Sequence, residues 1–264
     1  MRIGLAGWAI NRRFRDEKTP LAALEFPRVA REEFDIDLIE LNNVFLASHE
    51  DDYLKELVQS AWDQGVEMLG MAVDGTGNLS ALDADERAEA VRKAMVYFDV
   101  SEKLGLSYFR VNTGGSADGP PEMLSACVDS FQQLAQEGEK RGIKIVTENH
   151  GGLSTDPAMM VKLLVGVDSP AMGSLPDFGN FPEEIVLPGM AQILPFAAAA
   201  HVKWTRRDSD RNVADGKRDV VAFVQLCRQM GFDGALFIED GGACDHRGVL
   251  ELKGALLAAI NNRG

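Results

Sequence analysis

The chain is poor in the residues on which nucleic-acid-binding and disulfide-stabilised proteins depend. Its 27 lysines and arginines face 41 aspartates and glutamates, which gives a formal net charge of −14. Because this excess of negative charge repels phosphate groups, we do not expect the protein to bind nucleic acid. The three cysteines, Cys127, Cys227 and Cys244, show no CxxC spacing. A disulfide framework or a thiolate zinc site is therefore not expected.

Long hydrophobic runs are also missing. No stretch approaches the roughly 20 apolar residues that cross a bilayer. The region where the apolar part of a secretory signal would lie is interrupted by three arginines, Arg12, Arg13 and Arg15. We therefore expect a cytoplasmic protein that engages neither a membrane nor nucleic acid.

What the sequence does contain is a regular alternation of short apolar segments and helical segments. The expected strands are Arg2–Ala6, Asp37–Asn42, Val66–Val73, Tyr108–Asn112, Ile143–Val146, Ala171–Leu175, Ala199–Trp204 and Ala235–Ile238. Eight such units in 264 residues predict an α/β fold, a single (β/α)₈ TIM barrel domain over residues 1–264. The main alternative is a doubly wound open sheet. Its Gly-rich phosphate turn after the first strand is not matched by Gly4-Leu5-Ala6-Gly7.

Some helices carry specific expectations. We expect one from Thr19-Pro20 to about Glu33, kinked at Pro27. The helix over residues 51–64 places Trp62 at core spacing with Leu54 and Leu57. Another is expected over residues 217–230. On the last helix, Leu256 and Leu257 are expected to be exposed, which would permit a homo-oligomer.

Charged residues follow the last four expected strands, namely Glu148, Asp177, His201 and Glu239. The carboxyl ends of all strands in a parallel barrel face one mouth, so these side chains are expected to meet. Three carboxylates and one imidazole favour Mn²⁺, with Mg²⁺ or Co²⁺ possible. The alternative is four unrelated polar strand ends, since barrel mouths are generally polar.

Around these residues the chain resembles the xylose isomerase-like barrel superfamily, which contains sugar isomerases, epimerases and inosose-dehydratase-like enzymes. The similarity follows the eight-unit order along the whole chain. It is most specific in Thr147-Glu148-Asn149-His150, Leu175-Pro176-Asp177-Phe178-Gly179-Asn180, His201-Val202-Lys203 and Phe237-Ile238-Glu239. The resemblance implies that Glu148, Asp177, His201 and Glu239 bind one divalent metal. It also implies that Glu148 and Glu239 exchange protons with the substrate.

The expected activity is therefore that of a metal-dependent isomerase or epimerase, acting on a keto-sugar or cyclitol through an enediolate. A lyase, which dehydrates or β-eliminates a 3-keto-glycoside or inosose, would begin with the same proton abstraction. A non-catalytic sugar-binding or partner subunit is less expected because no metal ligand is missing. An abasic-site endonuclease shares the barrel, but it needs more metal-binding histidines and a basic groove.

Two residues bear on the choice between these activities. Sugar 3-epimerases of the family often carry histidine three residues past the metal aspartate, where this chain has Asn180. That departure favours the lyase. Arg207, six residues past His201, matches the substrate-contacting arginine of the epimerases. Thr113–Ser116 and Gly241-Gly242 offer backbone amides for a substrate phosphate, although glycine pairs are also common in simple turns.

Four further residues are candidates for contacting the substrate. His150 lies two positions beyond Glu148 and is either a substrate contact or a loop residue. Lys203 shares strand parity with His201, so it faces the mouth, where it either polarises a substrate oxygen or pairs with a carboxylate. Trp8 and Asn112 end their strands and are expected to line the pocket unless they serve packing or turns.

Overall fold

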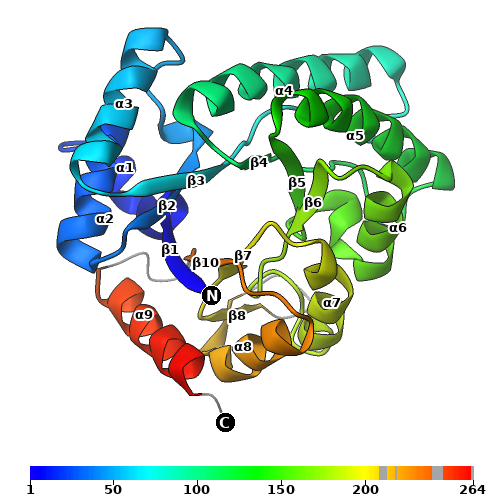
Figure 1. The fold of residues 1–264 in the computed structure, drawn as a ribbon. Helices are drawn as coiled ribbons and strands as arrows, with labels where there is room; N and C mark the ends of the chain where they lie inside the picture. Colours follow the sequence, from blue (N-terminus) through cyan, green and yellow to red (C-terminus); the bar gives the residue numbers. More distant parts are fainter. Residues whose placement is uncertain (208–212, 218, 240–245, 263–264) are drawn as a thin grey trace.

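Eight parallel strands form one sheet that curls into a nearly closed barrel (Figure 1). The computed structural model describes residues 1–264 except 208–212, 218, 240–245 and 263–264. The barrel strands are β1 (Arg2–Ala6), β2 (Leu38–Asn42), β3 (Glu67–Ala72), β4 (Tyr108–Arg110), β5 (Lys144–Glu148), β6 (Met172–Leu175), β7 (Ala199–Val202) and β10 (Ala235–Ile238). The predicted (β/α)₈ barrel is confirmed.

Strand neighbours follow chain order around the barrel. The sheet runs β6-β5-β4-β3-β2-β1-β10-β7, and β1 pairs in parallel with both β2 and β10. Two isolated bridges, Ser174 with Ala197 and Asp177 with His201, join the β6 and β7 sides. The second bridge brings two predicted metal ligands next to each other at the point of closure.

The helices surround the barrel on its outside (Figure 1). The longer ones are α2 (Phe26–Phe34), α3 (Asp51–Asp63), α4 (Ala84–Leu104), α5 (Pro121–Arg141), α6 (Pro157–Val167), α7 (Val186–Ile193), α8 (Val220–Gln229) and α9 (His246–Asn261). The carboxylates of Asp83 and Asp156 accept hydrogen bonds from the first amides of α4 and α6. Gly105 and Gly142 end α4 and α5 with left-handed backbones.

Short elements complete the chain. They are η1 (Gly7–Ile10), α1 (Asn11–Phe14), η2 (Ala23–Glu25), η3 (Asn43–Phe45), η4 (Gly152–Thr155), η5 (Leu194–Phe196), and an antiparallel pair, β8 (Thr205–Arg207) with β9 (Val213–Lys217). Among the described residues, no helix is both long and apolar enough to cross a membrane.

Apolar side chains fill the inside of the barrel below its mouth. They come from seven of the strands and include Leu38, Tyr108, Val146, Leu175 and Phe237. The two large rings fit because glycine stands beside each of them. A Cβ at Gly4 would lie 2.4 Å from the Phe237 ring, and one at Gly70 would lie 2.2 Å from the Tyr108 ring. The barrel floor is thus a packed layer.

Two expectations for the first helices are wrong. The segment from Thr19 does not form a helix, and α2 begins only at Phe26, with Pro27 in its first turn. Proline is tolerated there because the first-turn amides have no intrahelical acceptor, so no kink results. Trp62 is 80 % exposed. The buried stripe of α3 is Leu54, Leu57 and Ala61, and Trp62 lies just beyond its edge.

Two expectations for the C-terminal third also need correction. Lys217 belongs to β9, and α8 begins at Val220, after the capping residue Asp219. Leu256 is fully buried, because it continues the stripe of Val249 and Leu252 on α9 against the barrel. Leu257 alone of the predicted leucine pair is exposed, at 43 %.

Candidate active site

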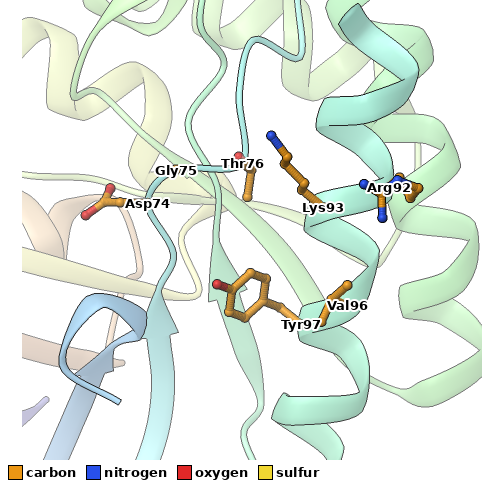
Figure 2. A pocket seen from close by; sticks show the side chains of 7 residues that line it. All are labelled: Asp74, Gly75, Thr76, Arg92, Lys93, Val96 and Tyr97. Carbon is orange, nitrogen blue, oxygen red and sulfur yellow. The ribbon is translucent and has the colours of Figure 1, made fainter. Parts of the chain in front are cut away.

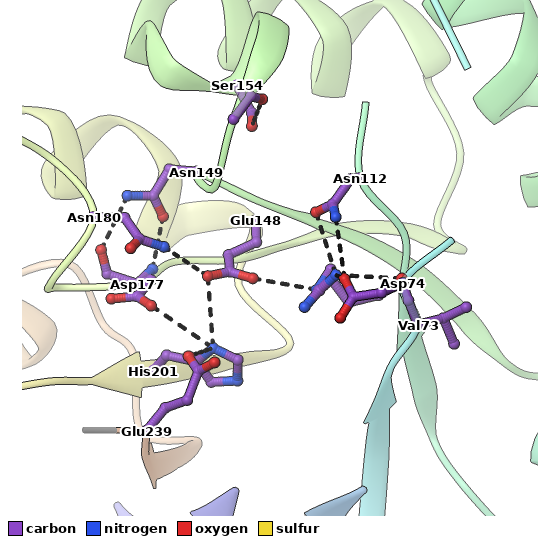
Figure 3. A network of polar contacts seen from close by, with 12 residues as sticks. Val73, Asp74, Asn112, Glu148, Asn149, Ser154, Asp177, Asn180, His201 and Glu239 are labelled. Carbon is purple, nitrogen blue, oxygen red and sulfur yellow. Dashed lines mark hydrogen bonds and ion pairs between the residues drawn. The ribbon is translucent and has the colours of Figure 1, made fainter. Parts of the chain in front are cut away.

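Four buried side chains gather at the carboxyl end of the barrel (Figure 3). Glu148 is the last residue of β5, His201 lies in β7, and Glu239 directly follows β10, while Asp177 comes two residues after β6. Each offers one nitrogen or oxygen atom, and these atoms all lie within 4.8 Å of one another. The convergence expected from the sequence is therefore present.

Strand periodicity explains why polar groups lie directly above the apolar floor. Successive side chains alternate faces, so a residue two positions further along points the same way. Val146 is followed by Glu148, Leu175 by Asp177, and Phe237 by Glu239 on this inner side. Each strand thus contributes one apolar residue to the floor and then one polar residue to the mouth.

The end of β6 is fixed by Asn149, which follows Glu148. Its side-chain oxygen accepts a hydrogen bond from the Asp177 amide (2.7 Å), and its Nδ2 donates to the Asp177 carbonyl (2.9 Å). The Asp177 Oδ1 atom accepts from the Gly179 amide (2.6 Å). The other carboxylate oxygen of Asp177 is thereby turned toward the cluster.

The His201 ring joins the four groups. Its Nδ1 atom lies 2.6 Å from Glu239 Oε2, 3.8 Å from Glu148 Oε1 and 4.0 Å from Asp177 Oδ2. Its Nε2 atom lies on the opposite side of the ring, 2.6 Å from Glu40 Oε2. Nδ1 is therefore the ring atom that faces the carboxylates.

The cluster fits a divalent cation. One atom of each member, namely Glu148 Oε2, Asp177 Oδ2, His201 Nδ1 and Glu239 Oε2, is buried without a hydrogen-bond partner. These four atoms do lie at ion-pair distance from charged groups, such as Arg110 and Lys203, but none of these contacts counts as a hydrogen bond. Ligands about 2.0–2.1 Å from a small hard cation lie at most about 4.2 Å apart. One ligand atom of each of the four residues lies within 4.8 Å of the others, which is close to that limit.

Arg110, buried at the end of β4, balances the charge of Glu148. Its Nε atom lies 3.2 Å from Glu148 Oε2, and its Nη1 atom donates to Asp74 Oδ1 (2.7 Å). Burial alone would raise the pKa of Glu148, but the Arg110 guanidinium holds it well below its usual range. Glu148 is thus an ionised carboxylate at neutral pH.

Lys203 balances the other two carboxylates. Its ammonium lies 2.6 Å from Asp177 Oδ2 and 3.4 Å from Glu239 Oε2. Burial and the neighbouring carboxylates raise the pKa of Asp177 to about 7, although Lys203 opposes this. Burial would also raise the pKa of Glu239, but His201 and Lys203 lower it to about 2. Of the two roles considered for Lys203, pairing with a carboxylate is the one observed.

Three of the predicted substrate contacts lie among these groups or at the barrel rim. Asn180 donates from Nδ2 to Glu148 Oε1 (2.7 Å) and lies 3.4 Å from Lys203 Nζ. Asn112 donates to Asp74 Oδ1 (3.3 Å), within the Arg110 network. Trp8, in η1 after β1, is half-buried, and the Arg15 guanidinium lies 4.5 Å from the centre of its ring.

The remaining predicted substrate contacts are either exposed or outside the described residues. His150 is exposed in the turn after β5. The backbone of Arg207 ends β8, but its side chain lies outside the described part of the chain, as do Gly241 and Gly242. These roles, and the phosphate contact considered for Thr113–Ser116, remain predictions.

Sequence reasoning missed two charged residues, Glu40 and Arg110. Both are buried and both face the barrel interior. The available signal was a single charge inside an apolar strand, in Leu38-Ile39-Glu40-Leu41 and in Phe109-Arg110-Val111. A lone buried charge that points into the barrel needs a polar or charged partner from another strand or loop.

Figure 2 shows a different pocket, between the loop after β3 and helix α4. It is lined by Asp74, Gly75, Thr76, Arg92, Lys93, Val96 and Tyr97. Arg92 and Lys93 both pair with Glu89 of their own helix. The Asp74 carboxylate binds Arg110 instead. Because these charges already have partners, we assign this pocket no part in the chemistry.

The fold and the cluster together define a (β/α)₈ barrel with a carboxylate–histidine group at its mouth that can hold a divalent metal. The chain belongs to the xylose isomerase-like TIM barrel family, whose model matches residues 29–253. A search of curated protein sequences found no match.

Several solved structures share the fold. One is D-psicose 3-epimerase with D-tagatose from Clostridium cellulolyticum H10, at 15 % identity and a TM-score of 0.74, covering 99 % of this chain and 97 % of that one. Another is 3-keto-D-glucoside 4-epimerase, YcjR, from E. coli, at 15 % identity and 0.73, covering 98 % of each chain. A third is the IolI protein with a bound zinc atom, at 15 % identity and 0.75, covering 98 % of this chain and 96 % of that one.

Proposed function

We propose that the protein is a divalent-metal-dependent sugar isomerase or epimerase that acts on a keto-sugar or cyclitol through an enediolate. The observation that carries the proposal is the convergence of four buried ligand atoms without hydrogen-bond partners, from Glu148, Asp177, His201 and Glu239, at the barrel mouth. The folds shared with two sugar epimerases support the substrate class.

In this proposal the four residues hold one metal ion, with Mn²⁺ first and Mg²⁺ or Co²⁺ as alternatives. The zinc atom bound by the IolI protein, which shares this fold, supports a divalent metal in the proposal. When bound, a divalent ion would polarise a substrate carbonyl and make the neighbouring C–H bond more acidic. The protein would supply the proton transfers.

Glu148 is the proposed base. Its carboxylate is kept ionised by Arg110, so it is ready to accept a proton from the carbon next to the carbonyl. Glu239, from the other side of the His201 strand, is itself ionised because its pKa is lowered to about 2, so it would pass to the substrate a proton taken up from solvent, while Glu148 releases to solvent the proton that it has accepted. Delivery to the opposite face of the same carbon gives epimerisation, and delivery to the adjacent carbon gives isomerisation.

Substrate contacts are proposed for the polar groups around the glutamates. Asn180 and Lys203 lie next to Glu148 and Asp177, where they can orient substrate hydroxyls. Asn112 and Trp8 would line the outer part of the pocket, and His150 and Arg207 would reach it from their loops. Trp8 offers an aromatic face to the apolar face of a sugar ring.

A lyase is the second candidate, and Asn180 is the observation that favours it. Sugar 3-epimerases of this family often have histidine at that position. Asn180 cannot act as a general acid, and here it is bound to Glu148. A dehydratase or β-eliminase acting on an inosose or a 3-keto-glycoside would share the first proton abstraction and then expel a hydroxyl or alkoxyl group.

The proposal is tested by incubating the Mn²⁺-loaded protein in deuterated water with a panel of keto-sugars, inososes and 3-keto-glycosides. Deuterium on the carbon next to the carbonyl with the sugar skeleton intact is the result expected of an isomerase or epimerase. Loss of water or of the aglycone would identify the lyase. Glu148→Gln is expected to slow either reaction by about 10²- to 10⁴-fold, the usual contribution of a general base.

Leu187→Ala serves as the control for Glu148→Gln, because Leu187 is an exposed residue of α7 and belongs neither to the cluster nor to the proposed substrate contacts. If Glu148→Gln exchanges deuterium as fast as this control and the wild type, Glu148 is not the base.

A further inference from the structure

Glu40 is a buried carboxylate that contacts the predicted cluster from β2, across the barrel interior, and the chemistry above does not use it. It lies in β2 with no exposed surface. Its Oε1 atom accepts a hydrogen bond from the Tyr108 hydroxyl (2.6 Å), and its Oε2 atom lies 2.6 Å from His201 Nε2. Both oxygens are therefore engaged by side chains from other strands, β4 and β7.

This contact fixes which nitrogen of His201 carries the proton. A carboxylate can only accept hydrogen bonds, so Nε2 must donate its N–H to Glu40. In a neutral imidazole the other nitrogen is then the unprotonated one. That nitrogen is Nδ1, which faces Glu148, Asp177 and Glu239.

Glu40 is itself held in place. The Tyr108 ring that binds it occupies the space left by Gly70 in β3, where a Cβ would lie 2.2 Å from the ring. Leu38, two residues earlier on the same side of β2, is fully buried in the barrel floor. The carboxylate therefore has little freedom to move away from His201.

We propose that Glu40 is a positioning residue. It holds the His201 ring so that Nδ1 is presented to the cation, and Tyr108 holds Glu40. The inference rests on the proposed function, since it requires that the cluster binds a metal. A carboxylate behind a metal-bound histidine fixes the ring and makes it a better ligand, and the loss of such a partner typically costs ten- to a hundredfold in metal affinity.

The first measurement is Mn²⁺ affinity by calorimetry for wild type, Glu40→Gln, Glu40→Leu and the control Leu57→Ala. Glu40→Leu is expected to bind about ten- to a hundredfold more weakly. Glu40→Gln should lose less, because its amide oxygen still accepts from Nε2–H while its NH₂ group faces Tyr108. Leu57→Ala removes a fully buried side chain of α3, outside the barrel, so it should lower the melting temperature and leave the affinity unchanged.

The second measurement is ¹⁵N NMR of histidine-labelled protein loaded with Zn²⁺, which is diamagnetic. In the wild type, His201 should show a protonated Nε2 with slow exchange and an unprotonated Nδ1. Glu40→Gln should keep this pattern, and Glu40→Leu should lose the slow exchange or show a second ring state. A role of Glu40 confined to stability would change neither the tautomer nor the exchange.

The outcomes separate the two proposals. If the wild type binds no divalent metal, the metal site and this inference both fail. If the wild type binds Mn²⁺ and folded Glu40→Gln and Glu40→Leu match its affinity and its His201 spectrum, only the positioning role is overturned. Should Glu40→Leu not fold, the Glu40→Gln affinity together with Tyr108→Phe decides. Tyr108→Phe leaves the His201 contact intact but releases the other oxygen of Glu40, so it should weaken binding by less than about tenfold. Wild-type affinity in both folded variants would overturn the positioning role.

Discussion

At the scale of single residues, His201 and Asp177 retain protons when no metal is bound. Burial would lower the pKa of His201, but Glu239 and Glu40 raise it well above its ordinary value. Burial raises the pKa of Asp177 to about 7. At neutral pH the imidazole is therefore protonated, and the Asp177 carboxyl is protonated in part of the molecules.

Metal binding is consequently expected to release protons and to strengthen as the pH rises from about 6 to about 8, because ligands bind metal only when deprotonated. The sign follows from the raised pKa values. Below about pH 7 Asp177 binds a proton that the cation must displace, and His201 must lose one throughout this range. Titration calorimetry in two buffers of different ionisation enthalpy measures the number of protons released. Equal apparent enthalpies in both buffers would contradict this account.

The three carboxylates of the cluster were predictable because each lies at or just beyond the end of a strand. Glu148, Asp177 and Glu239 appear in the sequence as charges that terminate apolar runs. Glu40 and Arg110 have no such mark, and their importance comes from partners on other strands, His201 and Glu148. Those pairings depend on the register of the closed barrel, and a single sequence does not contain that register.

At the scale of elements, Gly4 on β1 and Gly70 on β3 leave the space that the rings of Phe237 and Tyr108 need to pack in the barrel floor. A Cβ at Gly4 would lie 2.4 Å from two atoms of the Phe237 ring, so Gly4→Ala should force Phe237 to move. Overpacking of this kind typically costs about 1–3 kcal/mol. We expect a lower melting temperature in calorimetry and, because Phe237 precedes Glu239 by two residues, weaker metal binding.

Gly254→Ala is the matched control. Gly254 lies in α9, its added Cβ would meet no atom within 4 Å, and its replacement should stabilise the helix by about 0.5–1 kcal/mol. Equal destabilisation by both substitutions would show that close packing at Gly4 is not the cause.

Element identity was more predictable than element limits. All eight barrel strands were anticipated from apolar runs. The Thr19-Pro20 pair has the pattern of a helix start, but α2 begins at Phe26, where the apolar side chains Phe26 and Val29 are buried. The β8–β9 pair was missed because it has only three and five residues and no alternating apolar pattern in Thr205–Arg207 or Val213–Lys217.

At the scale of the whole molecule, closure of the barrel creates the site. Asp177 on the β6 side and His201 on the β7 side are bridged where the sheet closes, and Glu40 reaches His201 from β2, across the interior. Alternation of short strands and helices was enough to predict the barrel. The cross-barrel contacts became visible only when all strands were in place.

The central claim, that these four residues bind one divalent metal, is tested most directly by metal content. Wild type, Asp177→Ala and the double variant Glu148→Gln/Glu239→Gln are loaded with Mn²⁺, dialysed, and analysed by mass spectrometry of the bound metal. The account predicts one ion per wild-type chain and a loss of that ion in both variants. Folded variants that retain a full equivalent, or a wild type that retains none, would contradict it.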